Sequence, residues 1–170
     1  ARGHDWRVPE HFDATWAELP DYNRDAPAHP FRPYGATPGH GLEWARLLLH
    51  LEAGLTADGA SAPEWLRPAA VALFDRAMAD GWDEAHGGLC YTTDWDGTPV
   101  VEQHFHWVLC EGMATAALLH RVSGEARFAD WYRRMWEYAQ GVFLDPTVPG
   151  WQHEVHPDGP PSTVTWTGRP

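Results

Sequence analysis

The sequence is short of basic residues, and this shortage excludes one class of partner. Its 170 residues hold 12 Lys and Arg against 24 Asp and Glu, which gives a net charge of -12. A protein surface that binds DNA, RNA or an anionic membrane needs clustered Lys and Arg. The composition therefore argues against nucleic acid and against a membrane as the partner.

Cysteine is also scarce. The only two, Cys90 and Cys110, do not form a C-x-x-C pair. Two cysteines are too few for a disulfide framework, and without such a pair there is no motif for zinc or redox chemistry. We therefore expect a reducing, cytoplasmic setting.

Long hydrophobic runs are missing as well. No apolar run approaches the roughly 18 residues that cross a bilayer, and the N-terminus lacks the hydrophobic stretch of a signal peptide. We expect a soluble protein, with residues 1–170 as a single domain. Because the chain begins at Ala1 and stops directly after a strand-like stretch, we also expect it to be a segment of something longer.

The first 36 residues are rich in Pro, Asp and aromatic residues and predict an extended segment. After them, apolar residues recur at helical spacing in four stretches. The predicted helices span about 38–54, 61–81, 103–122 and 125–140. Their apolar stripes are Trp44, Leu48, Leu51 and Leu55; Leu66, Val71, Phe74 and Met78; Phe105, Leu109, Met113 and Ala116; and Phe128, Trp131, Met135 and Ala139.

The starts of the first two helices carry capping signals. Thr37 can cap the first helix, and Pro38 suits its first position. Ser61 and Glu64 have the spacing of a capping box for the second helix, although Pro68 can move its start later.

Strand-like pieces lie between the helix pairs, and they repeat. Residues 89–95 alternate in polarity ahead of Asp96-Gly97, a dipeptide typical of hairpin turns. Gly88 recurs as Gly150, and Asp96-Gly97 recurs as Asp158-Gly159, each 62 positions later. The repeating unit is helix, helix, hairpin, and its alignment puts His153 where Tyr91 stands.

This repeat predicts an all-α fold made of an array of helical hairpins. Such an array forms an open solenoid or a closed toroid, and it needs several neighbours to bury its inner faces. The chain holds only about two pairs. A stable barrel would need further sequence or another subunit, so a homo-oligomer and a missing N-terminal half are both expectations.

His40 is the first candidate for chemistry. It falls in the first turn of the first helix and shares a face with Glu43, one turn later. The helix dipole there favours a neutral imidazole, while Glu43 could orient the ring or raise its pKa. A histidine that caps the helix or lines the core, beside a surface glutamate, is the alternative.

His153 is the second candidate. A strand through this region would place Trp151, His153 and Val155 on one side and Glu154 on the other. The imidazole could act as an acid or base beside a tryptophan wall, or it could simply be buried and hydrogen-bonded. Because alternate strand residues diverge and no H-E-x-x-H motif is present, we expect no metal. Proton transfer by histidines needs no other cofactor, so none is expected.

Tryptophan is abundant, with eleven residues in the chain. Sugars offer C–H faces to flat aromatic rings and hydroxyls to carboxylates, so Trp with Asp and Glu suits a carbohydrate cleft. Trp107 and Glu111 are one helical turn apart and could form such a pair. Aromatic packing inside a helical toroid is the alternative.

Six stretches resemble the N-acylglucosamine 2-epimerase superfamily, especially its bacterial mannose isomerase and aldose-ketose isomerase members. They are PDYNRD at 20–25, FRPYG at 31–35, PGHGLEWARLL at 38–48, DWDG at 94–97, HWV at 106–108 and WQHE at 151–154. The resemblance covers nearly the whole chain, and the stretch around His40 is its most specific part.

The resemblance implies a fold, an activity and a site. The family fold is an (α/α)6 barrel of about twice this length with short β-hairpins at its mouth, and this chain looks like its C-terminal half. Two catalytic histidines are implied at His40 and His153. The implied substrate contacts are Glu43, Trp107, Glu111 and Trp151.

The implied reaction is the interconversion of an aldose and a ketose, of the mannose and fructose type, by proton transfer through a cis-enediol(ate). A monosaccharide is then the partner. The alternatives are an N-acylglucosamine or disaccharide 2-epimerase, a glycoside hydrolase on the same kind of barrel, and a noncatalytic sugar-binding protein. A histidine and an arginine that the family's first half contributes have no counterpart here, so this chain alone would hold an incomplete pocket.

Overall fold

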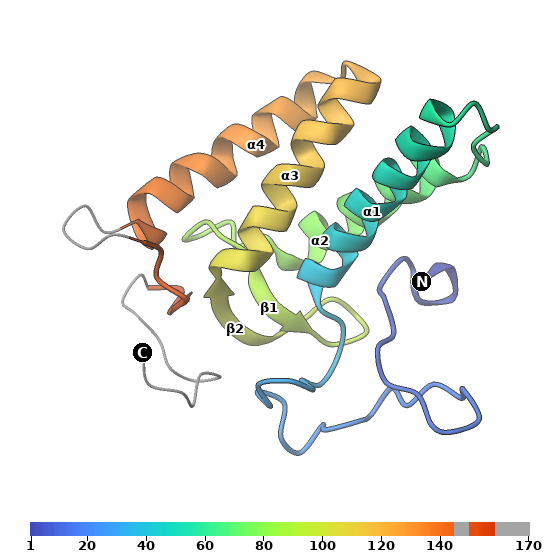
Figure 1. Ribbon diagram of the computed structural model, residues 1–170. Coiled ribbons are helices and arrows are strands. Elements are labelled where there is room, and N and C mark those ends of the chain that lie inside the picture. Colours follow the sequence, from blue (N-terminus) through green and yellow to red (C-terminus); the bar gives the residue numbers. More distant parts are fainter. Residues whose placement is uncertain (145–149, 159–170) are drawn as a thin grey trace.

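The computed structural model describes residues 1–144 and 150–158, and its main elements are two helical hairpins and a small sheet (Figure 1). In chain order they are η1 (Arg2–His4), α1 (Pro38–Ala57), α2 (Leu66–Gly81), β1 (Cys90–Thr93), β2 (Pro99–Phe105), α3 (His106–Ser123), α4 (Ala126–Tyr138), the π-helical turn η2 (Ala139–Phe143) and β3 (Glu154–Val155).

The two hairpins pack side by side through α1 and α3. α1 packs against both α2 and α3, and α4 packs against α3 (Figure 1). The two helices α1 and α3 approach each other closely, because the hydroxyl of Thr115 on α3 donates a hydrogen bond to the backbone carbonyl of Leu42 on α1, at 2.9 Å. α1 and α3 therefore form the shared centre of the described molecule.

The predicted apolar stripes are confirmed for three helices and wrong for one. The stripes predicted for α2, α3 and α4 face the core, although Phe105 belongs to β2 and Ala139 to η2. On α1 the buried apolar side chains are instead Leu42, Ala45 and Leu49, whereas Trp44 is 51% exposed and Leu51 is 49% exposed. Small and medium-sized residues occupy the face where α2 and α3 approach closely, so the larger stripe is left on the other side.

The predicted helix starts also need correction. Thr37 stands at the N-cap of α1, followed by Pro38, but its hydroxyl makes no capping hydrogen bond. α2 begins only at Leu66, after Trp65, so the capping box of Ser61 and Glu64 is wrong.

The third helix begins at His106 rather than near residue 103. Residues Pro99–Phe105 form β2 and pair with β1. The turn between them follows the prediction: the amide of Asp94 donates to the carbonyl of Thr98 at 2.7 Å, and Gly97 has φ 94°, which favours glycine. β2 leads directly into α3, so the sheet is attached to the start of that helix.

The 62-residue repeat appears in the backbone pairing. Trp82 bridges to Leu89, and Leu144 bridges to Trp151, so both partners recur 62 positions later. The second unit departs from the first because β3 pairs with β2, which gives the sheet the order β1-β2-β3. Gly159, which belongs to the repeat in the sequence, lies outside the described residues.

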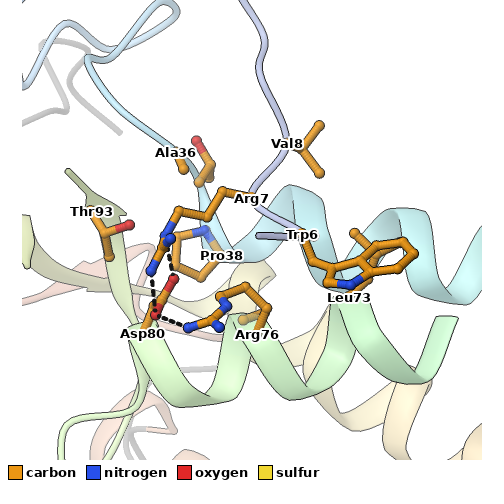
Figure 2. A pocket seen from close by; sticks show the side chains of 12 residues that line it. Trp6, Arg7, Val8, Ala36, Pro38, Leu73, Arg76, Asp80 and Thr93 are labelled. Atoms are coloured by element: carbon orange, nitrogen blue, oxygen red, sulfur yellow. Dashed lines mark hydrogen bonds and ion pairs between the residues drawn. The ribbon is translucent and has the colours of Figure 1, made fainter. Parts of the chain in front are cut away.

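Residues 5–36, here called the N-terminal segment, contain no helix or strand element and are anchored by side chains. Arg7 and Asp80 form two hydrogen bonds of 2.8 and 3.1 Å, and both side chains are nearly buried. Arg76 donates to the same carboxylate at 3.1 Å, so one aspartate on α2 holds two guanidinium groups (Figure 2). Of the described helices, none combines the length and the apolar character that a membrane span requires.

Replacing Phe128 tests the packing between the helical hairpins. The Phe128 ring is fully buried and meets Phe74 edge to face, with centroids 5.4 Å apart. Phe128→Ala is expected to lower the free energy of unfolding by about 4 kcal/mol, because it removes buried surface and leaves a cavity. The matched control is Phe31→Ala, at an 87% exposed position, which should change it by less than about 0.5 kcal/mol. Urea unfolding of both variants measures the difference, and equal losses would contradict this packing.

Candidate active site

The predicted site residues gather at one end of the helices. The first turn of α1, the first turn of α3 and the β-sheet lie at this same end (Figure 1). His40 lies on α1, Trp107 on α3, and His153 directly before β3. The chain therefore brings residues from both repeat units to a common region.

His40 is held by two neighbours. Its Nδ1 lies 2.7 Å from a carboxylate oxygen of Glu10, which comes from the N-terminal segment. Its ring lies 5.3 Å from the indole of Trp107, centroid to centroid. The imidazole is half-buried and hydrogen-bonded on one side, and its Nε2 has no hydrogen-bond partner within residues 1–144 and 150–158.

The charges around His40 favour its protonated form. Burial alone lowers the pKa of this imidazole, but the hydrogen bond to Glu10 and the negative charges of Glu10, Glu43 and Glu111 raise it further than burial lowers it. The net pKa lies above the usual value of about 6.5. Glu43 acts as expected on the charge of the ring, whereas the hydrogen bond comes from Glu10.

Glu111 is paired across the two helices. Both of its carboxylate oxygens accept from Arg46 on α1, at 2.6 and 3.0 Å. This bidentate pair fixes the carboxylate in one orientation and raises the pKa of the arginine, chiefly through the hydrogen bond to Glu111. The site therefore carries a fixed carboxylate beside Trp107, one turn along the same helix.

An aromatic series connects the two halves of the site. The Tyr91 ring meets Trp107 edge-on at 6.4 Å and Phe105 at 4.4 Å, and Phe105 in turn meets His153 at 5.5 Å. Burial raises the pKa of Tyr91 to about 12, with a further contribution from the charges of Glu10 and Glu154. The phenol therefore stays neutral at physiological pH.

His153 has a different environment from His40. It is exposed, and its carbonyl accepts from the backbone amide of His106 at 3.3 Å. Burial of part of the ring, together with the nearby His106, lowers the pKa of His153 below its usual value. Trp151 is also exposed and lies 6.4 Å from His106, ring centroid to ring centroid.

The predicted sidedness of this strand is only partly correct. Val155 is fully buried, whereas Trp151 and His153 are exposed, and Glu154 is buried beside Val155. The regular strand covers only Glu154–Val155, so the alternation expected over 151–155 does not extend through it.

Six predicted site residues thus fall into two groups. His40, Glu43, Trp107 and Glu111 surround the contact between α1 and α3, and His153 with Trp151 lies next to β2 and the start of α3. Tyr91 and Phe105 stand between the groups, because the Phe105 ring contacts both Tyr91 and His153. No described cluster of three or more His, Cys, Asp or Glu side chains has the arrangement to hold a metal ion.

Two contributors escaped the sequence interpretation. Glu10 lies 30 positions before His40 in a segment without periodicity, and no local signal connects the two. Arg46 lies three residues after Glu43 on α1 and pairs with Glu111 on α3. The spacing from Glu43, together with the presence of Glu111 on the third predicted helix, is the signal in the sequence that could have identified Arg46.

The fold and the site together define a class: paired helical hairpins that carry histidines, carboxylates and tryptophans at the end where their β-strands lie. The model of the family described as N-acylglucosamine 2-epimerase matches residues 1–170, and the chain belongs to this family.

Relatives within the family are similar over nearly the whole chain. A protein of Thermobifida fusca named D-mannose isomerase is 47% identical over 168 residues, which are 98% of this chain but 40% of that protein. A crystal structure of D-mannose isomerase superposes with a TM-score of 0.85 at 34% identity, covering 91% of this chain and 38% of that one. Cellobiose 2-epimerase from Spirochaeta thermophila, at 20% identity and a TM-score of 0.71, shares the fold. The chain thus spans about two fifths of the length of these relatives.

The two histidines should titrate in a defined order. We expect His40 to lose its proton at a higher pH than His153, because carboxylates raise the pKa of His40 while burial and His106 lower that of His153. Proton NMR of the imidazole signals across pH 5 to 9 measures both midpoints, with assignments from His40→Gln and His153→Gln. The reverse order would contradict the charge arrangement of the site.

Proposed function

We propose that the protein is a sugar isomerase that interconverts an aldose and a ketose, of the mannose and fructose type. The observation that carries the proposal is His40, held by Glu10 and lying 5.3 Å from the Trp107 ring at the N-terminal end of α1. The similar protein of Thermobifida fusca is named D-mannose isomerase, which supports mannose as the aldose.

The architecture that goes with this function is a helical barrel of which the chain forms a part. The two packed helical hairpins and the 62-residue recurrence of their bridges support a longer array with the same repeat. The chain covers 40% of the similar protein, so residues from the rest of that length, or from another subunit, would complete the pocket.

The proposed mechanism uses the two histidines as complementary groups. A neutral His153 takes the proton from C2 of the ring-opened aldose, while protonated His40 gives its proton to the carbonyl oxygen, which yields a cis-enediol. His153 then returns the proton to C1 as the hydroxyl at C2 loses its own to His40, and the ketose results. Opposite shifts of the two pKa values suit one base and one acid at neutral pH.

Binding would rest on the remaining four predicted residues. Trp107 and Trp151 offer flat faces to the sugar C–H groups, and Glu43 and Glu111 accept from its hydroxyls. Because Arg46 fixes Glu111 through two hydrogen bonds, that carboxylate is already oriented before a sugar arrives.

Proton NMR of D-mannose in D2O is the first test of this function. With the chain added, deuterium should enter the sugar and fructose signals should appear, because the enediol exchanges its proton with solvent. The same experiment is run on a version as long as the curated relatives. Deuterium entry with glucose as the product would instead support a 2-epimerase, since the proton would return to the opposite face of C2. Neither exchange nor product with the longer version would contradict proton transfer on mannose.

Replacing each histidine tests the division of labour. His40→Gln and His153→Gln should each lower turnover by about 100-fold or more, the usual contribution of a general acid or base. His50→Gln is the matched control, because His50 is an exposed histidine on the same helix as His40. Urea unfolding checks that the fold is kept, and near-normal turnover in either site variant would remove that residue from the mechanism.

A further inference from the structure

The N-terminal segment reaches the candidate site at a single carboxylate. Glu10 is only 19% exposed, and its oxygen lies 2.7 Å from Nδ1 of His40, 30 residues further along the chain. Its partner is half-buried, so water is partly excluded from the contact and the interaction is screened less than one at the open surface.

This contact decides which nitrogen of the ring carries the proton. An ionised carboxylate can only accept hydrogen bonds, so Nδ1 must be the donor. In the neutral imidazole Nε2 is then left without a proton, and it has no hydrogen-bond partner among the residues that the structure describes. Nε2 is therefore the atom available for proton transfer.

Glu10 is itself fixed by anchors on both sides. Three residues earlier, Arg7 is bound to Asp80 by two hydrogen bonds in the cluster that also includes Arg76 (Figure 2). On the other side, the ring of His11 is hydrogen-bonded to the carbonyl of Pro33 at 2.8 Å. The backbone around Glu10 is thus held in place independently of His40.

We propose that Glu10 is the positioning residue of His40, holding the imidazole with its proton on Nδ1 so that Nε2 gives and accepts the transferred proton. The role of Nε2 in turnover rests on the function proposed above, whereas the tautomer does not. The cluster of Arg7, Asp80 and Arg76 keeps Glu10 at this distance.

Other charged groups also face His40 and must be separated from Glu10. Glu43 comes from α1 itself, and Glu111 comes from α3, where Arg46 pairs with it. Neither makes the hydrogen bond to Nδ1, so only Glu10 can set the tautomer, while all three carboxylates favour the protonated ring.

The first measurement needs no variant. Nitrogen-15 NMR of the unmodified chain above the midpoint of His40 distinguishes a proton on Nδ1 from one on Nε2. We expect the Nδ1–H tautomer for His40. A dominant Nε2–H tautomer would overturn the proposal, whether or not the protein isomerises a sugar.

The second measurement replaces the carboxylate. Glu10→Gln keeps the shape but removes the charge, and the titration midpoint of His40 should fall by about one pH unit or more. Glu10→Asp keeps the charge and should retain part of that shift. The matched control is Glu18→Gln, because Glu18 also belongs to the N-terminal segment and binds a different histidine, His4, at 2.6 Å. An unchanged His40 midpoint in Glu10→Gln, or an equal fall in the control, would overturn the proposal.

Turnover then separates this inference from the proposed function. In a version active on mannose, Glu10→Gln should move the alkaline limb of the pH–rate profile in the same direction as the His40 midpoint, because turnover requires protonated His40. If the midpoint moves while the pH–rate profile does not, Glu10 positions His40 but Nε2 is not the transferring atom, and that part of the proposal is overturned.

Discussion

The close contact between the first turns of α1 and α3 is the constraint on which the site depends. A Cβ on Gly39 would lie 2.6 Å from Cη2 of Trp107, a distance that packed atoms do not tolerate. Only glycine at this position allows the Trp107 indole to pack against the first turn of α1. Because His40 is the next residue, the indole also lies beside its ring. The contact between the Trp107 and His40 rings, and the hydrogen bonds between Glu111 and Arg46, both follow from this approach.

The electrostatics of the site follow from how each histidine is enclosed. His40 lies where three glutamates converge from the N-terminal segment, α1 and α3, so its burial is outweighed by negative charge. His153 lies beside another histidine, and the charge of His106 opposes its protonation. The pKa values of two identical side chains are thereby shifted in opposite directions by their neighbours.

Much of the fold could be predicted from the sequence, because helical periodicity and turn chemistry are local. The stripes of α2, α3 and α4 and the turn at Asp96-Gly97 are confirmed. The stripe of α1 is wrong because periodicity identifies an apolar face without showing which face a neighbouring helix covers. Leu42, Ala45 and Leu49 are buried because α2 and α3 approach on that side.

The site could be predicted only where the signal was local or carried by resemblance. The proximity of Trp107 and Glu111, one turn apart on the same helix, is a local signal of this kind and could be predicted. Glu10 does not, because its contact with His40 closes a loop of 30 residues through a segment without periodicity. Such contacts depend on where the segment is anchored, and the anchoring residue, Asp80, lies 70 residues after Glu10 in the sequence.

The repeat in the backbone has a consequence for how such a chain can diverge. Tyr91 and His153 occupy equivalent places in the two units, and both rings contact the same Phe105. One is a buried neutral phenol and the other an exposed imidazole. A duplicated unit can therefore keep an aromatic ring in one copy, where it supports packing, while the other copy exchanges it for an ionisable ring. The scaffold is preserved because the first copy still fills the space against Phe105.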